Sequence, residues 1–261
     1  MEHNCPAWVL DNCVIRNAMK KLLPGFLILI SACQTATPTP VQEPIPAEIV
    51  QTPTEAASAT PSATLTPAFT PTPLPLFFTD QFNADMNSWL SFQTGGETAP
   101  EVGLINDFLR LDISSPDTWY YFLHNTHTYS DVFINAQFVG TPAGSMGLVC
   151  RYSDAGWLEF NIANNGTYNV LFAHWLAEGI AEYTPIATDS SEYIHAGTFD
   201  YEIGLTCQEN YVLLHVNGKL FRKIDVARFG LTEGNVGLSV ASFDETPMIA
   251  SFDWFSVGQP E

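Results

Sequence analysis

The chain has 261 residues, of which 46% are hydrophobic and only 14% charged, so it has enough apolar side chains to build a substantial core. Its 28 acidic residues against 9 basic ones leave a formal net charge of −19 at pH 7. Long-range repulsion between this charge and any polyanion argues against nucleic acid as a partner.

The first 33 residues carry an export signal. Met19 is followed by two lysines and an apolar run over 22–30, which is typical of secretory signals and too short for a membrane span. The run ends in Ile-Ser-Ala-Cys, and this ending resembles the lipobox of bacterial lipoproteins, in which the cysteine, here Cys33, receives diacylglycerol. An ordinary signal peptide cleaved near Ala32 is the alternative. Because the signal begins at Met19, we expect that residue to be the true start.

The resemblance to lipoproteins implies where the protein works. We expect acylated Cys33 to anchor it to a lipid bilayer outside the cytoplasm, on the cell surface or in the periplasm. The lipid bilayer is therefore a predicted partner.

Residues 34–75 form a stalk rich in Thr and Pro. Ten prolines and ten threonines occur here, without a single Lys or Arg, so the segment has too little apolar surface to fold. We expect a disordered linker whose Thr-Pro pairs favour polyproline II and hold the rest of the chain up to roughly 100 Å from the membrane. A scaffold for O-linked sugars on the threonines is the alternative.

One folded domain is predicted over 76–261. Short β-branched and aromatic runs alternate here with period two, between turns rich in Gly, Asn, Asp and Pro. Tight hairpins are expected at 164–166 and at Asn217-Gly218, where Asn and Gly accept positive φ angles. We therefore expect an all-β sandwich of two antiparallel sheets. The predicted strands are 77–82, 108–113, 120–124, 132–139, 146–152, 157–162, 168–172, 199–207, 211–216, 220–224, 235–243 and 249–257.

Two cysteines inside this domain are expected to form a disulfide. Alternation places Cys150 and Cys207 on the apolar faces of their strands, so that they can meet in the core. Export would bring them into an oxidising compartment, whereas a metal site would need four ligands close together.

Several short segments of the domain resemble the concanavalin A-like jelly roll, above all its laminin-G-like and glucanase-like members. These segments are 78–82 with Trp89, 147–152, 157–162, 166–168, 216–218, 234–238 and 251–255. The resemblance spans nearly the whole domain and implies a jelly-roll sandwich. It says more about the fold than about an activity.

The resemblance also raises the question of catalysis. Retaining glucanases of this fold carry Glu, Asp and Glu at alternate positions of one strand, so that two carboxylates flank the sugar bond. The nearest match is 159–164, where Glu159 is present but Asn161 and Asn164 stand in place of the acids. Without a general acid for the leaving oxygen, we expect that the domain is not an enzyme. Glu159 is then either a ligand contact on an open sheet face or a solvated strand residue.

The sequence gives little support for a metal or other cofactor. His124 and His127 stand three residues apart without a third ligand nearby in the sequence, so no metal site is expected from them. The jelly-roll resemblance leaves room for a structural calcium ion, with the carboxylates of Asp80, Asp85 and Asp253 as oxygen donors.

Aromatic and polar side chains on one strand indicate ligand binding. Alternation puts Trp157, Glu159 and Asn161 on one face, with Arg151 pointing outward on the preceding strand. Sugar rings stack on aromatic faces, while amide and charged groups bind their hydroxyls. The residues expected to extend this patch at its rim are Trp119, Tyr121, His174 and Trp175. Packing in the core is the competing explanation for each aromatic side chain.

These patterns together predict a membrane-tethered, monomeric binding module for a carbohydrate or another cell-surface ligand, without catalysis or a required cofactor. One alternative is an enzyme that acts on glycosides, similar to the keto-disaccharide hydrolases of the same fold. Another is a domain for protein–protein adhesion or scaffolding, which would show an exposed apolar patch without a groove.

Overall fold

In a computed structural model the chain is described over residues 74–141 and 143–260. The signal region 1–33, including Cys33, and nearly all of the linker 34–75 lie outside these residues, so the predictions made for them stay predictions. Within the described residues, no helix has the length and apolar character needed to cross a membrane.

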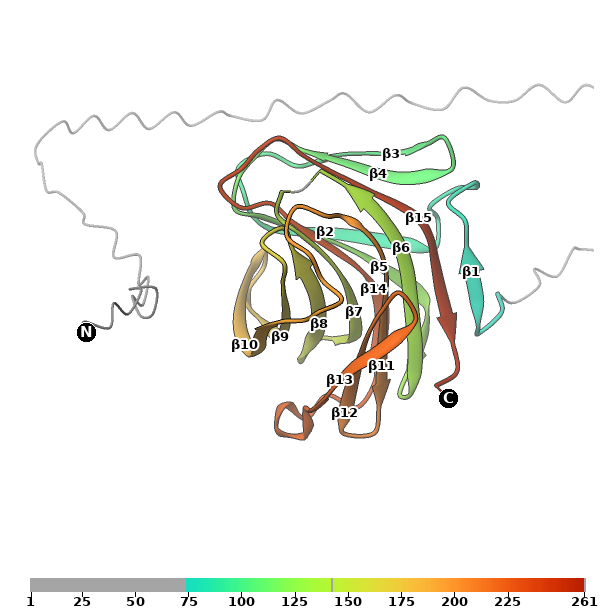
Figure 1. The fold of residues 1–261 in the computed structure, drawn as a ribbon. Helices are drawn as coiled ribbons and strands as arrows, with labels where there is room; N and C mark the ends of the chain where they lie inside the picture. Colours follow the sequence, from blue (N-terminus) through green and yellow to red (C-terminus); the bar gives the residue numbers. More distant parts are fainter. Residues whose placement is uncertain (1–73, 142, 261) are drawn as a thin grey trace, which may run out of the picture. The chain divides into compact units, whose positions relative to one another are not determined.

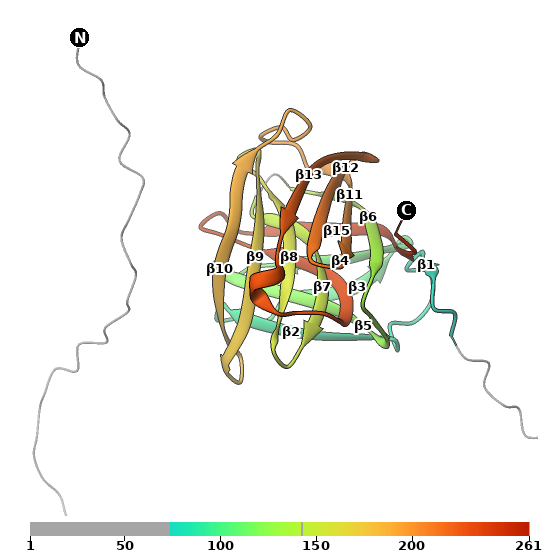
Figure 2. The same ribbon diagram turned by 90° about the horizontal axis from the view of Figure 1, so that it is seen from below.

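Two antiparallel β-sheets lie face to face, which confirms the predicted all-β sandwich (Figures 1 and 2). Sheet A has eight strands: β13 (Lys219–Asp225), β12 (Tyr211–Val216), β11 (Asp200–Gln208), β6 (Val132–Gly140), β15 (Met248–Gly258), β4 (Phe108–Ile113) and β3 (Glu101–Ile105) in spatial order, with β1 (Phe78–Asp80) pairing with β15. Sheet B has seven strands: β10 (Ile180–Ser190), β9 (Thr167–Ala177), β8 (Gly156–Ala163), β7 (Ser145–Ser153), β14 (Gly234–Ala241), β5 (Thr118–Tyr129) and β2 (Trp89–Gly95). A short 3-10 helix, η1 (Ala227–Phe229), connects β13 to β14.

The two predicted hairpins are confirmed by the backbone angles of their turns. Asn217 and Gly218, which join β12 to β13, have φ angles of 50° and 71°, as a tight turn of this kind requires. Gly166 has a φ of 83° in the turn between β8 and β9. These turns set the register of two neighbouring strand pairs.

The core between the sheets comes from the strand faces that alternation predicted. Leu148 and Phe160 of sheet B and Ile203 of sheet A are fully buried there. The disulfide between Cys150 and Cys207 is confirmed: it joins β7 to β11 across the core, with the two Cα atoms 6.6 Å apart. In the chain-entropy model, a bridge over a sequence separation of 57 residues contributes about 4 kcal/mol to stability.

Three strands, β2, β3 and β10, were not among the predicted ones, and all three lie at sheet edges. An edge strand packs against neighbours on one side only, so its sequence pattern is weaker than that of a central strand. In β10 every residue is at least partly exposed, and the strand contains Pro185, a residue that sheets accept at edges because it cannot donate to a ladder.

The two edge strands of sheet B come together. Sheet B curls so strongly that β10 and β2 contact each other across its outer face, the face turned away from sheet A. As a result its middle strands are covered on both sides, and all eight residues of β8 are buried. The outer face of sheet B is the part of the fold that positions the candidate site.

Candidate functional site

Five aromatic side chains meet on the outer face of sheet B and form what we call the ring cluster: Phe92, Tyr121, Trp157, Trp175 and Tyr183. Each comes from a different strand, in this order β2, β5, β8, β9 and β10. The rings of Phe92 and Tyr121 stack with centroids 4.6 Å apart, and that of Trp157 lies 5.2 Å from Trp175 and 5.4 Å from Tyr121. The cluster is therefore a second apolar core, separate from the one between the sheets.

Tyr183 of β10 ties the two edges of sheet B together. Its hydroxyl lies 2.5 Å from Oγ1 of Thr94 on β2 and 3.1 Å from the hydroxyl of Tyr121. Its ring stacks on Trp119 of β5, with centroids 5.5 Å apart. Burial raises the pKa of Tyr183 to about 12, so the hydroxyl keeps its proton at neutral pH. This residue bridges the outer face from edge to edge.

A buried polar network lies beneath the ring cluster and centres on Glu159. The Glu159 carboxylate accepts hydrogen bonds from Tyr121 Oη at 2.9 Å, Asn161 Nδ2 at 2.8 Å and Ser239 Oγ at 2.9 Å. Burial raises the pKa of Glu159, and these hydrogen bonds offset part of that shift. These three hydrogen bonds offset part of the free-energy cost of burying a carboxyl group in such an apolar setting.

The predicted central patch is therefore buried. Trp157, Glu159 and Asn161 do share one face, as alternation predicted, but they are only 0%, 1% and 3% exposed. Glu159 is thus neither a solvated strand residue nor a side chain on an open sheet face. The physical reason is the curling of sheet B, which places β2 and β10 over the middle strands.

Beside the ring cluster, an open pocket of about 490 Å³ remains accessible. Phe92 and Trp175 form its apolar walls, and Gln93 and Glu178 also line it, although its accessible surface is almost entirely apolar. The side-chain amide of Gln93 donates a hydrogen bond to the backbone carbonyl of Gly95. The other lining residues are Ala177, which ends β9, and Gly179, which lies in the turn between β9 and β10. The volume lies within the range of about 300–1,000 Å³ that is typical of small-ligand sites. We call this the Phe92–Trp175 pocket.

The four residues predicted to form the rim of the patch lie in different surroundings in the structure. Trp175 lines the pocket, Tyr121 is fully buried in the ring cluster, and Trp119 lies under Tyr183. His174 lies on the opposite face of β9 from Trp175, where its ring stacks on Phe172 and its Nε2 lies 3.4 Å from a carboxylate oxygen. Of the predicted patch, Trp175 alone is among the residues that line this pocket.

The prediction that Arg151 points outward is wrong. Its side chain is 2% exposed, and its guanidinium donates hydrogen bonds to the backbone carbonyls of Leu231 at 2.8 Å and Glu209 at 2.7 Å. The register of β7 and β8 shifts at this point, and Arg151 itself has a φ of 55°. This bulge interrupts the alternation and brings Tyr152 onto the outer face, 5.6 Å from the ring of Trp157.

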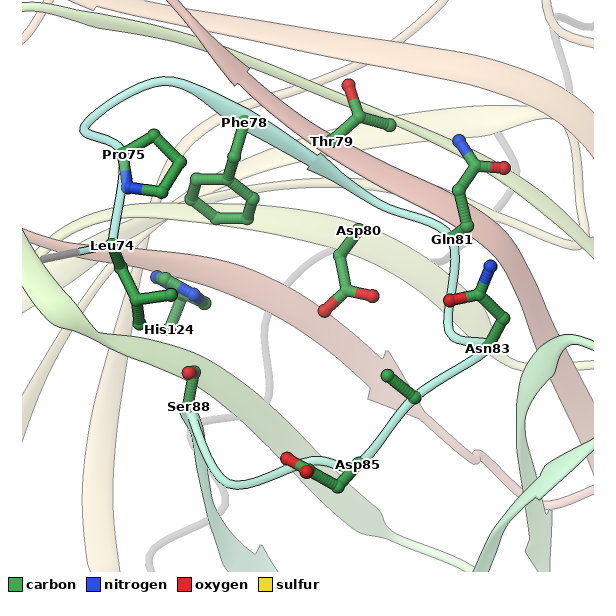
Figure 3. A pocket seen from close by; sticks show the side chains of 11 residues that line it. Leu74, Pro75, Phe78, Thr79, Asp80, Gln81, Asn83, Asp85, Ser88 and His124 are labelled. Carbon is green, nitrogen blue, oxygen red and sulfur yellow. The ribbon is translucent and has the colours of Figure 1, made fainter. Parts of the chain in front are cut away.

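A second pocket, of about 310 Å³, lies next to β1 and contains two of the aspartates considered for calcium (Figure 3). Asp80 accepts hydrogen bonds from the backbone N–H of Phe82 and from Nε1 of Trp89, one on each carboxylate oxygen. Asp85 accepts one from a backbone N–H two residues on. Within the described residues, no three Asp, Glu, His or Cys side chains gather around a common point. Asp80, Asp85 and Asp253 do not fit a shared calcium site, and calcium stays a prediction.

His124 also lines this second pocket, at the side of the aromatic core (Figure 3). Its ring centroid lies 4.3 Å from that of Phe78 and 5.3 Å from that of Trp89. Burial lowers the pKa of His124 to about 4. The nearby His127 instead contacts the backbone carbonyl of Leu74 through Nε2, at 3.2 Å. The two histidines therefore have separate partners in the structure.

Sequence reasoning did not identify four residues that shape the outer face: Phe92, Gln93, Glu178 and Tyr183. All four come from β2, from β10 or from the turn that precedes β10. Residues 89–94 carry one aromatic residue on each face of the strand, Trp89 on one and Phe92 on the other. The segment therefore did not stand out as a strand with one buried face. The signal that could have found β10 is the Tyr-Thr-Pro-Ile run at 183–186, in which Tyr183 and Ile186 stand on either side of the Thr-Pro pair.

The two antiparallel sheets, their strand order and the core between them define a jelly-roll sandwich with a galectin-like, concanavalin A-like fold. Among solved structures, a Bacillus subtilis protein of unknown function with a galectin-like fold matches with a TM-score of 0.53 and 14% identity, over 70% of this chain and 94% of that one. No protein-family model and no curated protein sequence matches the chain.

Two further similar structures have names that refer to carbohydrates. The carbohydrate-binding module CBM66 from Bacillus subtilis has a TM-score of 0.45 and 16% identity, over 64% of this chain and 93% of that one. A Bacillus licheniformis β-glucanase has a TM-score of 0.48 and 13% identity, over 70% of this chain and 98% of that one. At such identities the likeness concerns the fold.

The comparison corrects the expectation that the domain is not an enzyme. Glycoside hydrolases, including glucanases from Bacillus licheniformis and Bacteroides ovatus, occur among the similar structures alongside the binding module, at 12–16% identity. The missing acids near Glu159 rule out one arrangement of catalytic groups on one strand and do not rule out catalysis as a whole.

Proposed function

We propose that the domain binds carbohydrate in the Phe92–Trp175 pocket. The observation that supports this most directly is the pair of aromatic side chains, Phe92 and Trp175, that form the walls of an almost entirely apolar pocket. Sugar rings present apolar C–H faces to aromatic side chains, and their hydroxyls bind to amide and carboxylate oxygens. The pocket offers the aromatic surface, and the exposed residue Glu178 in the adjoining turn is the carboxylate nearest to it for binding hydroxyls at the rim.

The aromatic walls are held rigidly, which favours binding. Phe92 stacks on Tyr121, and its ring lies 5.1 Å from that of Trp175. Trp175 in turn packs against Trp157, which is completely buried. Because these rings are already fixed by their neighbours, a ligand that stacks on them costs little side-chain entropy.

Trp175→Ala tests this proposal on a glycan array with the full-length protein. Removing one stacking ring should weaken binding at least about tenfold, which corresponds to about 1.4 kcal/mol. Leu176→Ala is the matched control, because Leu176 is the next residue in β9 and is 62% exposed but does not line the pocket. Urea unfolding of both variants checks that the ring cluster stays folded. Equal binding by Trp175→Ala and wild type, or a wild type that binds no glycan, would contradict the proposal.

We further propose that the domain works outside the cytoplasm, tethered through acylated Cys33. The disulfide between Cys150 and Cys207 supports this, because such bonds persist in oxidising compartments. In cells given a labelled fatty acid, the wild-type chain should carry the label and fractionate with membranes, whereas Cys33→Ser should do neither. Labelled Cys33→Ser protein would contradict the tether.

A further inference from the structure

The middle of sheet B offers no accessible surface to a long ligand. On the outer face, Val149 and Trp157 are 0% exposed, Ser239 is 2% exposed and Ala241 is 1% exposed. These residues come from β7, β8 and β14, which are the central strands of sheet B. A polysaccharide that crossed these strands would need an open cleft, but the side chains at this place are buried.

Tyr183 closes the same face from edge to edge. The residue reaches from β10 to Thr94 on β2, and its ring lies over Trp119 on β5. A polymer that ran through would have to break the contact with Thr94 and the hydrogen bond to Tyr121. It would also have to separate the stacked rings. The bridge thus blocks the path that an internal segment of a polysaccharide would need.

The Phe92–Trp175 pocket lies at one end of this closed face. On one side it is bounded by the turn between β9 and β10, and on the other by Phe92 and Gln93 of β2. Behind its two aromatic walls stand Tyr121 and Trp157, both fully buried. A ligand that enters the pocket is therefore stopped by the buried side chains of the ring cluster.

The charge around the pocket selects against acidic ligands. Glu178 is the charged residue among those that line it. The chain beyond Leu76 contains 23 acidic and 6 basic residues, so the net charge of this part of the chain repels anionic ligands at long range. A carboxylated or sulfated sugar would meet repulsion there that a neutral sugar would not.

From the closed face, the one-ended pocket and its charge, we propose that the pocket binds the end of a neutral glycan chain and not an internal segment. This inference rests on the proposed carbohydrate function and specifies which part of the carbohydrate is recognised. Neighbouring sugar units of the same chain would extend away from the pocket into solvent and add little binding energy.

Titration calorimetry with oligosaccharides of increasing length tests the inference on the full-length protein. The probes are cello-, laminari-, xylo- and manno-oligosaccharides, each from the disaccharide to the hexasaccharide. For a ladder that binds, affinity should stay within about threefold from the shortest to the longest member, because only the terminal units contact protein. A rise of tenfold or more, about 1.4 kcal/mol, would show an extended groove and overturn the inference while leaving carbohydrate binding intact.

Two further arms complete the experiment. A galacturonate ladder of the same lengths should bind at least about tenfold more weakly than the neutral ladder, and equal affinity would overturn the choice of a neutral chain. Absence of binding to every ladder, and to the glycan array, would remove the proposed function and this inference with it. Length-dependent affinity and complete absence of binding are therefore separate outcomes.

Discussion

Tyr183→Phe is the most informative single change, because it removes one oxygen atom and leaves the stacked ring in place. The lost hydroxyl contacts Oγ1 of Thr94 and the hydroxyl of Tyr121. Thr94 is 4% exposed, so water does not readily replace the missing partner, whereas Tyr121 keeps its hydrogen bond to Glu159. Each lost hydrogen bond costs about 0.5–1.5 kcal/mol, which predicts a destabilisation of about 2 kcal/mol in total.

Urea unfolding followed by tryptophan fluorescence measures this loss, since Trp119 and Trp157 lie beside Tyr183. With a slope of about 2 kcal/mol per molar urea, the midpoint should fall by about 1 M. Tyr211→Phe is the control, because Tyr211 lies on sheet A beneath the ammonium group of Lys223. If Tyr183→Phe shifted the midpoint no more than this control, the edge-to-edge bridge would not be a stabilising feature, and the argument for a closed face would fail.

Two predictions concern pH. Burial raises the pKa of Glu159, so the folded state holds this proton more tightly than the unfolded chain; the stability advantage of wild type over Glu159→Gln should be largest below about pH 4 and shrink as the pH rises. In urea titrations across pH, a constant difference between the two proteins would contradict this. His124 behaves in the opposite sense: because burial lowers its pKa to about 4, wild type should lose roughly 3 kcal/mol between about pH 7 and pH 4, whereas His124→Gln should lack that component. His195→Gln, a change in an exposed loop, serves as control, and a wild-type pH profile in His124→Gln would refute the assignment.

The pH tests also separate the two sides of sheet B. Glu159 lies under the ring cluster, and His124 lies beside the second pocket near β1. If only one of the two variants, Glu159→Gln or His124→Gln, altered the pH dependence of stability, the result would show which of these two regions accounts for it. Neither test depends on the identity of a ligand, so both remain valid if the carbohydrate proposal fails.

The sequence alone was sufficient for the sandwich core. Strands with a clear apolar face, such as β8 and β11, were predicted to within one residue at each end, and the pairing of Cys150 with Cys207 followed from their common orientation. Asn217-Gly218 indicated its hairpin for a local reason, because few other residues accept two successive positive φ angles. The signal, the stalk and Cys33 rest on the sequence entirely.

The candidate site depended on tertiary structure. Alternation correctly put Trp157, Glu159 and Asn161 on one face, but whether that face is open or covered depends on how far sheet B curls, and this is a property of all its strands together. The cover comes from edge strands whose patterns are weak, and the bulge at Arg151 reverses orientation without a clear signal in the sequence. Local sequence therefore determined which way most side chains point, while only the curled sheet decided that Tyr183 bridges its edges and that Phe92 and Trp175 form a pocket.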